Sequence, residues 1–191
     1  MVITIDGPAG AGKSTVARAL ADRLGYRYVD TGSMYRELTA AAMQHGIDPD
    51  DGDALAGLVG QAPKAPVDLR SEEVSARVSA VSRHPQVRER MRARQRALAH
   101  DAVLEGRDTG TRVCPGADVK VYLVASLESR AARRAVDLGL DPAEVAETIA
   151  ARDRHDSEQL APAADAHVID TSGLTVPDVV EQVLRLVEAA A

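Results

Sequence analysis

The feature that most constrains the fold is a glycine-rich turn near the start of the chain. The β-branched run Val2–Ile5, which predicts a strand, ends just before this turn. Glycines then stand at positions 7, 10 and 12, and the helical pattern of Lys13–Leu24 follows at once. A strand, a tight turn and a helix in this order predict the opening unit of an α/β fold.

Four later segments have the pattern of strands, the last three of them buried, and helical patterns separate them. They are Tyr26–Val29, Ala102–Leu104, Val119–Ala125 and His167–Asp170. The core must be aliphatic, because the chain has no Phe, no Trp and four Tyr, and such a core suits helices packed on a parallel sheet. We therefore predict a three-layer α/β/α fold with a five-stranded parallel sheet, in one domain of 191 residues.

Capping signals indicate where the helices begin and end. Ser33 is a candidate N-cap for the helix after the second strand, and Gly46 stands where that helix would end. Further along, Leu127–Leu138 and Ala143–Ala151 are expected to form an arginine-rich pair of helices between two strands.

The turn itself carries a chemical signal. The eight-position P-loop pattern is matched in full by Gly7-Pro8-Ala9-Gly10-Ala11-Gly12-Lys13-Ser14. Glycines let successive backbone N–H groups point at phosphate oxygens, and the following helix adds the positive end of its dipole. Lys13 is expected to reach the β- and γ-phosphates of a nucleoside triphosphate, and the Ser14 hydroxyl to ligate its Mg²⁺. The alternative, an incidental glycine-rich turn, is disfavoured by the strand–turn–helix context.

Bulk properties exclude several classes of protein. The net charge of −6 argues against a general affinity for nucleic acid or for an anionic membrane, and no apolar run approaches membrane length. The single cysteine, Cys114, cannot form an internal disulfide, and the five histidines are scattered and indicate no metal site. We expect a cytoplasmic protein that acts as a monomer.

Three later stretches indicate the acceptor of the phosphoryl group. They are Asp30-Thr31-Gly32-Ser33-Met34-Tyr35-Arg36, Glu105-Gly106-Arg107-Asp108-Thr109-Gly110 and Arg152-Asp153-Arg154-His155-Asp156-Ser157. Together with the P-loop, in this order and at this spacing, they closely resemble the bacterial cytidylate kinases. The resemblance runs from Val2 to about Val187, with one weak patch at Pro49–Leu69. It implies transfer of a phosphoryl group from MgATP to CMP or dCMP, giving ADP and CDP or dCDP.

The resemblance also implies a role for each matching residue. Thr31 and Arg36 would hold the monophosphate, Ser79, Arg88 and Asp108 would face the cytosine, and Arg107 would bind the acceptor phosphate. Arg152 and Asp156 would contact the acceptor's phosphate and sugar. ATP would be bound by Gly7 to Ser14, by Thr15, and by Arg130 and Arg134. The residues expected to act in catalysis are Lys13, Arg107, Arg134 and Arg152.

The resemblance further divides the chain into functional segments. Residues 1–35, 101–129 and 160–191 would form the core of a single kinase domain. Residues 36–100 would form the acceptor-binding segment, and residues 130–159 would form a helical lid.

Two departures from the family pattern stand out. The small antiparallel sheet insert of the acceptor-binding region is reduced to Lys64–Leu69 at most, so the chain is an unusually short member. In the lid, Gln159 stands three residues after Asp156, where the family usually has an arginine, and Arg154 is a candidate replacement.

These departures leave alternatives open. The chain could phosphorylate another acceptor, such as UMP, AMP or a non-nucleotide alcohol. It could also be a nucleotide-binding relative without catalytic activity. Against the second alternative stand Arg36, Arg107, Asp108, Arg152 and Asp156, which a pure nucleotide switch has no reason to assemble.

Overall fold

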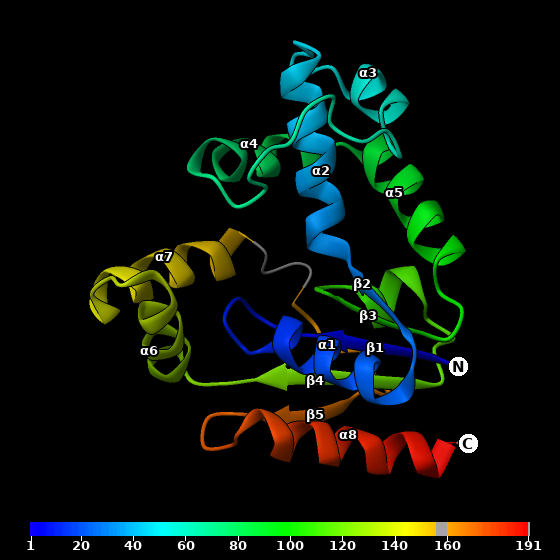
Figure 1. Ribbon diagram of the computed structural model, residues 1–191, viewed down its shortest axis with the longest axis vertical. Helices are drawn as coiled ribbons and strands as arrows, with labels where there is room; N and C mark the ends of the chain where they lie inside the picture. The colour runs from blue at the N-terminus through cyan, green and yellow to red at the C-terminus, as the bar shows by residue number, and fades with distance from the viewer. Residues whose placement is uncertain (156–159, 191) are drawn as a thin grey trace. The chain divides into compact units, whose positions relative to one another are not determined.

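The computed structural model describes residues 1–155 and 160–190 (Figure 1). The chain forms two compact units. One unit comprises Met1–Val29 and Ala99–Ala191, and the other comprises Asp30–Leu98.

The first unit is built on a parallel sheet with the order β2-β3-β1-β4-β5 (Figure 1). The strands are β1 (Val2–Asp6), β2 (Arg27–Asp30), β3 (Ala102–Gly106), β4 (Val119–Val124) and β5 (His167–Asp170). In the register of the sheet, Asp6 at the end of β1 is level with Gly106 of β3 and Tyr122 of β4. The carboxyl ends of these strands therefore meet at the edge where the glycine-rich turn begins.

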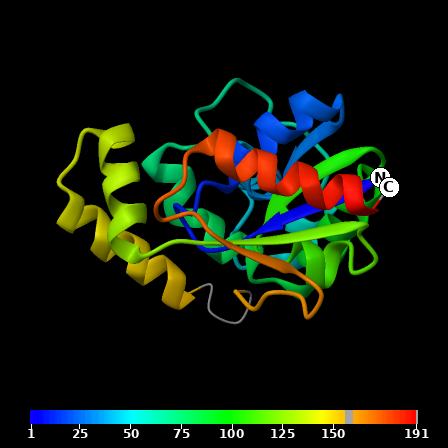
Figure 2. The same ribbon diagram turned by 90° about the horizontal axis from the view of Figure 1, so that it is seen from below.

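Helices α1 (Lys13–Leu24) and α8 (Val176–Ala190) pack against each other and against the sheet (Figure 2). Their inward residues, such as Leu20 and Val183, share one aliphatic core with Ile3, Ile5 and Leu123 of the strands, and all five side chains are fully buried. Burial of an aliphatic side chain contributes about 1.5–3 kcal/mol. This core holds the strand and helix on either side of the glycine-rich turn.

Helices α6 (Leu127–Leu138) and α7 (Pro142–His155) lie side by side as a helical hairpin, which we call the lid hairpin after the role expected of it from the sequence (Figures 1 and 2). Ser126 caps α6 by accepting a hydrogen bond from the Ser129 N–H, and Gly139 ends the helix with a φ of 67°. The buried residues Ala131, Ala135, Val145 and Ile149 of the two helices form a small apolar cluster, which also includes Ala9 of the glycine-rich turn.

The second unit is helical. It contains α2 (Thr31–Gln44), α3 (Gly52–Gly57), α4 (Glu72–Ser82) and α5 (Pro85–Ala97). Leu38, Leu55, Val81, Val87 and Met91 form its core. Residues 61–71, all of them described, contain no strand.

Side chains of α2 hold the loop of residues 61–71. The Gln44 side-chain amide donates to the Ala65 carbonyl at 3.0 Å and accepts from the Ala65 N–H at 3.1 Å. Arg36 donates from Nη1 to the carbonyl of Leu69 at 3.0 Å and to the Ser75 hydroxyl at 2.9 Å. The loop is therefore fixed along α2 by side chains rather than by pairing with a strand.

The α/β class and the five-stranded parallel sheet are confirmed, and each predicted strand appears within two residues of its expected bounds. The prediction of Ser33 as an N-cap is wrong. Asp30 caps α2, accepting at 2.8 Å from the Ser33 N–H, because its carboxylate stands three residues before that N–H group. Gly46 follows the end of α2 with a φ of 66°, as expected. In the described ranges, no helix has the length and apolar character needed to cross a bilayer.

Candidate functional site

The residues Gly7–Ser14, which we call the phosphate cradle, connect β1 to α1. Gly7 has a φ of 145°, and a Cβ atom there would lie 2.2 Å from the carbonyl oxygen of Leu123. Only glycine fits this position, because the turn runs directly against the backbone of β4. Gly10 and Gly12 also have positive φ angles, of 78° and 89°, so the chain curls around before α1 begins.

Three cations from three different elements bind successive carbonyl groups of the cradle. They are Arg107, which donates from Nη1 to the Gly7 oxygen at 2.7 Å, Lys13, which donates from Nζ to the Pro8 oxygen at 2.8 Å, and Arg130, which donates from Nη1 to the Ala9 oxygen at 2.9 Å. Lys13 and Arg130 are buried, and Arg107 is half-buried. Positive charge thus surrounds the turn, and the N-terminus of α1 adds to it, so the cradle suits an anion.

A buried carboxylate joins β1 to the segment that follows β3. Asp6 accepts hydrogen bonds from the N–H and hydroxyl of Thr109 at 3.0 and 2.8 Å and from the N–H of Gly110 at 2.8 Å. Burial raises the pKa of Asp6 above its usual value of 3.8, and these hydrogen bonds oppose the rise. The carboxylate anchors a π-helical turn, Thr109–Val113, at the edge of the sheet.

The same turn orients Asp108, which directly precedes it. The Asp108 carbonyl accepts from the N–H groups of Arg112 and Val113, and its carboxylate lies 4.0 Å from Nε of Arg112. Asp108 and Arg107 therefore stand at the carboxyl end of β3, on a segment that Asp6 fixes beside the cradle.

The lid hairpin contributes two arginines with well-defined positions. Arg130 pairs with Asp153 of α7 at 2.6 Å, and both are largely shielded from solvent. Arg133 donates to the hydroxyl and carbonyl of Thr171, and the Thr171 hydroxyl in turn donates to the Ala11 carbonyl of the cradle at 3.3 Å. Arg134, by contrast, is exposed on α6.

Three residues singled out in the lid are not fully described by the structure. Arg152 lies on α7, but its side chain is not described. Asp156 and Gln159 lie outside the described residues. Within the first unit, the structure brings together the cradle, Arg107, Asp108 and Arg130.

The predicted acceptor-binding residues of the second unit lie on three helices. Thr31 is the buried first residue of α2, and Arg36 of the same helix is held by Leu69 and Ser75. Arg88 of α5 donates from Nε to the Ser82 carbonyl at 2.8 Å, at the end of α4. Ser79 is exposed on α4.

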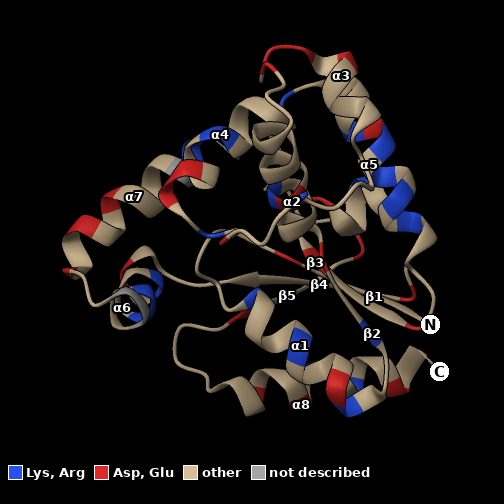
Figure 3. Cartoon of the chain, turned by 45° about the horizontal axis from the view of Figure 1, so that its top comes forward, with Lys and Arg blue, Asp and Glu red and all other residues tan. Residues whose placement is uncertain are grey.

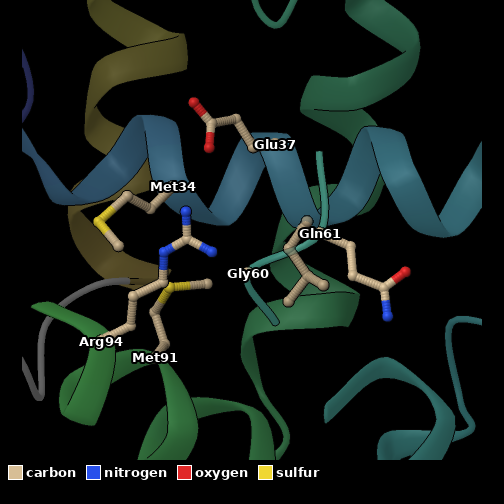
Figure 4. A pocket seen from close by; sticks show the side chains of 7 residues that line it. Met34, Glu37, Gly60, Gln61, Met91 and Arg94 are labelled. Carbon is tan, nitrogen blue, oxygen red and sulfur yellow. The ribbon is translucent and has the colours of Figure 1, made fainter. Parts of the chain in front are cut away.

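A small cavity of the second unit lies apart from these residues (Figure 4). Its volume is about 10 Å³, close to the room that one water molecule needs. Figure 4 shows the Arg94 side chain reaching from α5 toward Met34 of α2, while Glu37 points away from Arg94. None of Thr31, Arg36, Ser79 and Arg88 is among its lining residues, which are Met34, Glu37, Leu38, Gly60, Gln61, Met91 and Arg94. Arginines occur all along α5 (Figure 3), and Arg90, for example, donates to the Ala56 carbonyl rather than facing this cavity.

The sequence did not single out Asp6, Thr109 and Asp153 as parts of the site. A signal existed for Asp6, because an acid at the end of a buried strand needs hydrogen-bond donors nearby. A weaker one existed for Asp153, because an acid between two arginines of a lid helix invites an ion pair.

A parallel sheet whose first strand runs through such a cradle into a helix defines the P-loop class of α/β folds. Solved structures agree: a shikimate kinase from Bacteroides thetaiotaomicron matches with a TM-score of 0.55 and 15% identity, covering 97% of each chain. A gluconokinase from Sinorhizobium meliloti matches with a TM-score of 0.54 and 19% identity, covering 99% of this chain and 93% of the other. At these identities the likeness concerns the fold alone.

The sequence comparisons go further. The family model described as cytidylate kinase matches residues 3–189. A protein of Geobacillus thermodenitrificans named cytidylate kinase is 46% identical over 97% of this chain and 95% of its own length. The chain belongs to the cytidylate kinase family.

The chain is shorter than this relative. Their alignment runs over 213 positions, whereas the whole chain has 191 residues, so the relative has at least 22 residues without a counterpart here. The shortness expected from the sequence is therefore confirmed.

Proposed function

We propose that the chain transfers the γ-phosphoryl group of MgATP to CMP or dCMP, giving ADP and CDP or dCDP. The observation that carries this proposal is the complete phosphate cradle, with three cations on its successive carbonyl groups, in a member of the cytidylate kinase family. The related proteins are named cytidylate kinases, which supports cytidine monophosphates as the acceptors.

For the donor, the N–H groups of Gly7 to Thr15 would receive the phosphates, and Lys13 would turn from the Pro8 carbonyl to the β- and γ-phosphates. Mg²⁺ prefers oxygen ligands and keeps several waters, so the Ser14 hydroxyl at the start of α1 fits it together with the phosphates themselves. In the described ranges no cluster of three ligating side chains exists that could hold a metal independently of ATP. Arg130 and Arg134 would stabilise the ATP from the lid hairpin.

For the acceptor, Arg107 would bind the phosphate and Asp108 the cytosine, both from the end of β3. From the other segments, the proposed acceptor ligands are Thr31, Arg36, Ser79, Arg88, Arg152 and Asp156. A phosphate oxygen is already an adequate nucleophile, so positioning and positive charge supply the catalysis. Loss of one arginine that meets developing charge costs about 3–4 kcal/mol of barrier.

We propose further that residues 130–159 act as a lid and residues 36–100 as the acceptor-binding segment. A lid over the cradle excludes water, which limits ATP hydrolysis and strengthens each charged contact.

A coupled assay of ADP release with CMP, dCMP, UMP and AMP tests the proposal. CMP and dCMP are expected to be turned over well, and UMP and AMP poorly. Efficient turnover of UMP or AMP with poor turnover of both cytidine nucleotides would contradict the acceptor. ATP binding without transfer to any monophosphate would contradict catalysis.

A further inference from the structure

One residue of the phosphate cradle, Ala9, is bracketed by an ion pair from the lid hairpin. Arg130 donates from Nη1 to the Ala9 carbonyl at 2.9 Å and to Oδ2 of Asp153 at 2.6 Å. The Ala9 N–H donates to Oδ1 of Asp153 at 3.4 Å. Both polar groups of the same peptide residue are therefore engaged, one by each member of the pair.

The surroundings make this pair more than a surface contact. The side chains of Arg130 and Asp153 are 9% and 21% exposed. Removing one member of a shielded pair leaves the other charge uncompensated, so such pairs hold their geometry more firmly than exposed pairs. Nε of Arg130 donates to the Ala125 carbonyl at 3.1 Å, which fixes one edge of the guanidinium plane, and Asp153 fixes a second edge.

Apolar packing brings the two charged residues to the cradle. Ala9 belongs to the cluster of the lid hairpin that contains Ile149, one helical turn before Asp153. At Gly10, a Cβ atom would lie 3.1 Å from Cβ of Arg130 and 3.6 Å from Cδ1 of Ile149. The position of the pair is thus set by close contact between the cradle and the hairpin.

We propose that Asp153 is a positioning residue for the donor site: it holds the Arg130 guanidinium against the cradle, so that the cation is in place when the triphosphate binds. This proposal deepens the proposed function and rests on the cradle being the ATP site. Asp153 itself need not contact the nucleotide.

A carboxylate beside an anion site could instead compete with the phosphates. The distances argue for positioning, because the 2.6 Å bond goes to Arg130 and the contact with the Ala9 N–H is 3.4 Å long. The carboxylate therefore interacts more strongly with the cation than with the cradle donor. The two roles predict opposite changes in ATP affinity.

A double-mutant cycle on ATP binding tests the proposal. ATP alone, with Mg²⁺ and without any acceptor, is titrated into the wild type, Asp153→Asn, Arg130→Met and the double variant. Asp153→Asn is expected to weaken ATP binding about tenfold, since the charged acceptor that holds the Arg130 guanidinium is replaced by a neutral amide. If Asp153 acts through Arg130, the double variant binds ATP no more weakly than Arg130→Met alone. Multiplied effects, or tighter ATP binding by Asp153→Asn, would overturn the proposal.

A matched control comes from the same helix. Glu147→Gln removes one negative charge from an exposed position of α7 and is expected to leave ATP affinity within about twofold, as surface charges usually do. A loss with Glu147→Gln equal to that with Asp153→Asn would assign the effect to net charge and would refute a positioning role.

A second measurement does not depend on the Arg130 variant being folded. Asp153→Asn is expected to raise the KM for ATP while the KM for CMP stays within about twofold, and Asp153→Glu is expected to restore part of the loss. A general loosening of the fold would raise both KM values and escape rescue by glutamate, which would refute the proposal. Because the ATP titration contains no acceptor, it stays valid even if the acceptor proves to be a nucleotide other than CMP.

Discussion

Arg107 donates a hydrogen bond of 2.7 Å to the carbonyl oxygen of Gly7, a residue 100 positions earlier in the chain. This bond ties the end of β3 to the first residue of the phosphate cradle. An arginine proposed to bind the acceptor is thereby fixed to the loop proposed to bind the donor, so both phosphates would meet one cation at this edge of the sheet.

Replacement of Arg107 by methionine is expected to lower kcat/KM for CMP by about a hundredfold to a thousandfold, because one donor to developing charge is lost. Steady-state kinetics with CMP as the varied substrate measure this. Arg23→Met, at an exposed position of α1, is the matched control and is expected to have little effect. A change of less than tenfold for Arg107→Met would remove this residue from the proposed machinery.

Replacement of Gly7 by alanine is expected to destabilise the fold strongly. The added Cβ atom would lie 2.2 Å from the Leu123 carbonyl oxygen, so β1 and β4 would have to separate locally. We expect a loss of about 3 kcal/mol or more in the free energy of unfolding, from overpacking together with backbone strain.

Gly25→Ala separates the two contributions to that loss. Gly25 has a φ of 68° and open space around its Cβ position, so alanine there meets strain without a clash. Its expected cost is about 1 kcal/mol. Urea unfolding of both variants compares the two costs, and equal losses would contradict the close approach of the backbones at Gly7.

Replacement of Gln44 by alanine is expected to release the loop of residues 61–71. The side-chain amide of Gln44 makes two hydrogen bonds to the backbone of Ala65, and alanine can make neither. Faster hydrogen exchange of the Ala65 amide is expected, with a loss of about 1 kcal/mol or less in global stability because the site is exposed. Gln86→Ala, which removes a side-chain bond to Asp53, is the control and should leave exchange at Ala65 unchanged.

Asp6 predicts a characteristic pH dependence of stability. Burial raises its pKa above 3.8, so the native state holds the proton more tightly than the unfolded state does. The contribution of Asp6 to the free energy of unfolding is therefore largest below pH 3.8 and declines as the pH rises through the raised pKa. Asp6→Asn lacks this titration.

The difference in unfolding free energy, wild type minus Asp6→Asn, should therefore shrink between about pH 4 and the raised pKa and then level off. Unfolding in urea at several pH values from 4 to 7 measures it. A difference that grows with pH would mean that the hydrogen bonds from Thr109 and Gly110 outweigh burial.

Much of the fold could be predicted because each strand of the sheet is indicated by its own short stretch of sequence. Each of the five strands is a short segment that contains β-branched residues, and Gly7 to Ser14 follows a pattern that tolerates few alternatives. The cap of α2 was misplaced because Asp30 and Ser33 are both good capping residues, and only the backbone conformation at the start of the helix selects between them.

The contacts between distant residues could not be predicted in the same way. The sequence indicates that Lys13 and Arg107 are functional, but the pairing of Arg107 with the Gly7 carbonyl depends on the order of the strands. The pairing of Arg130 with Asp153 likewise depends on how α6 and α7 pack. A single sequence leaves such long-range partners undetermined, because many arginines and acids compete for each pair.

The packing of Ala9 against the lid hairpin constrains which residues can replace it during evolution. The same methyl group lines the phosphate-binding turn and fills the apolar seam of the lid hairpin beside Ile149. The size of the side chain at position 9 therefore sets the distance between the turn and the hairpin. A bulkier residue would push α6 and α7 outward, and glycine would leave a gap beneath them. Natural variation at this position should accordingly go together with compensating changes in volume on the hairpin.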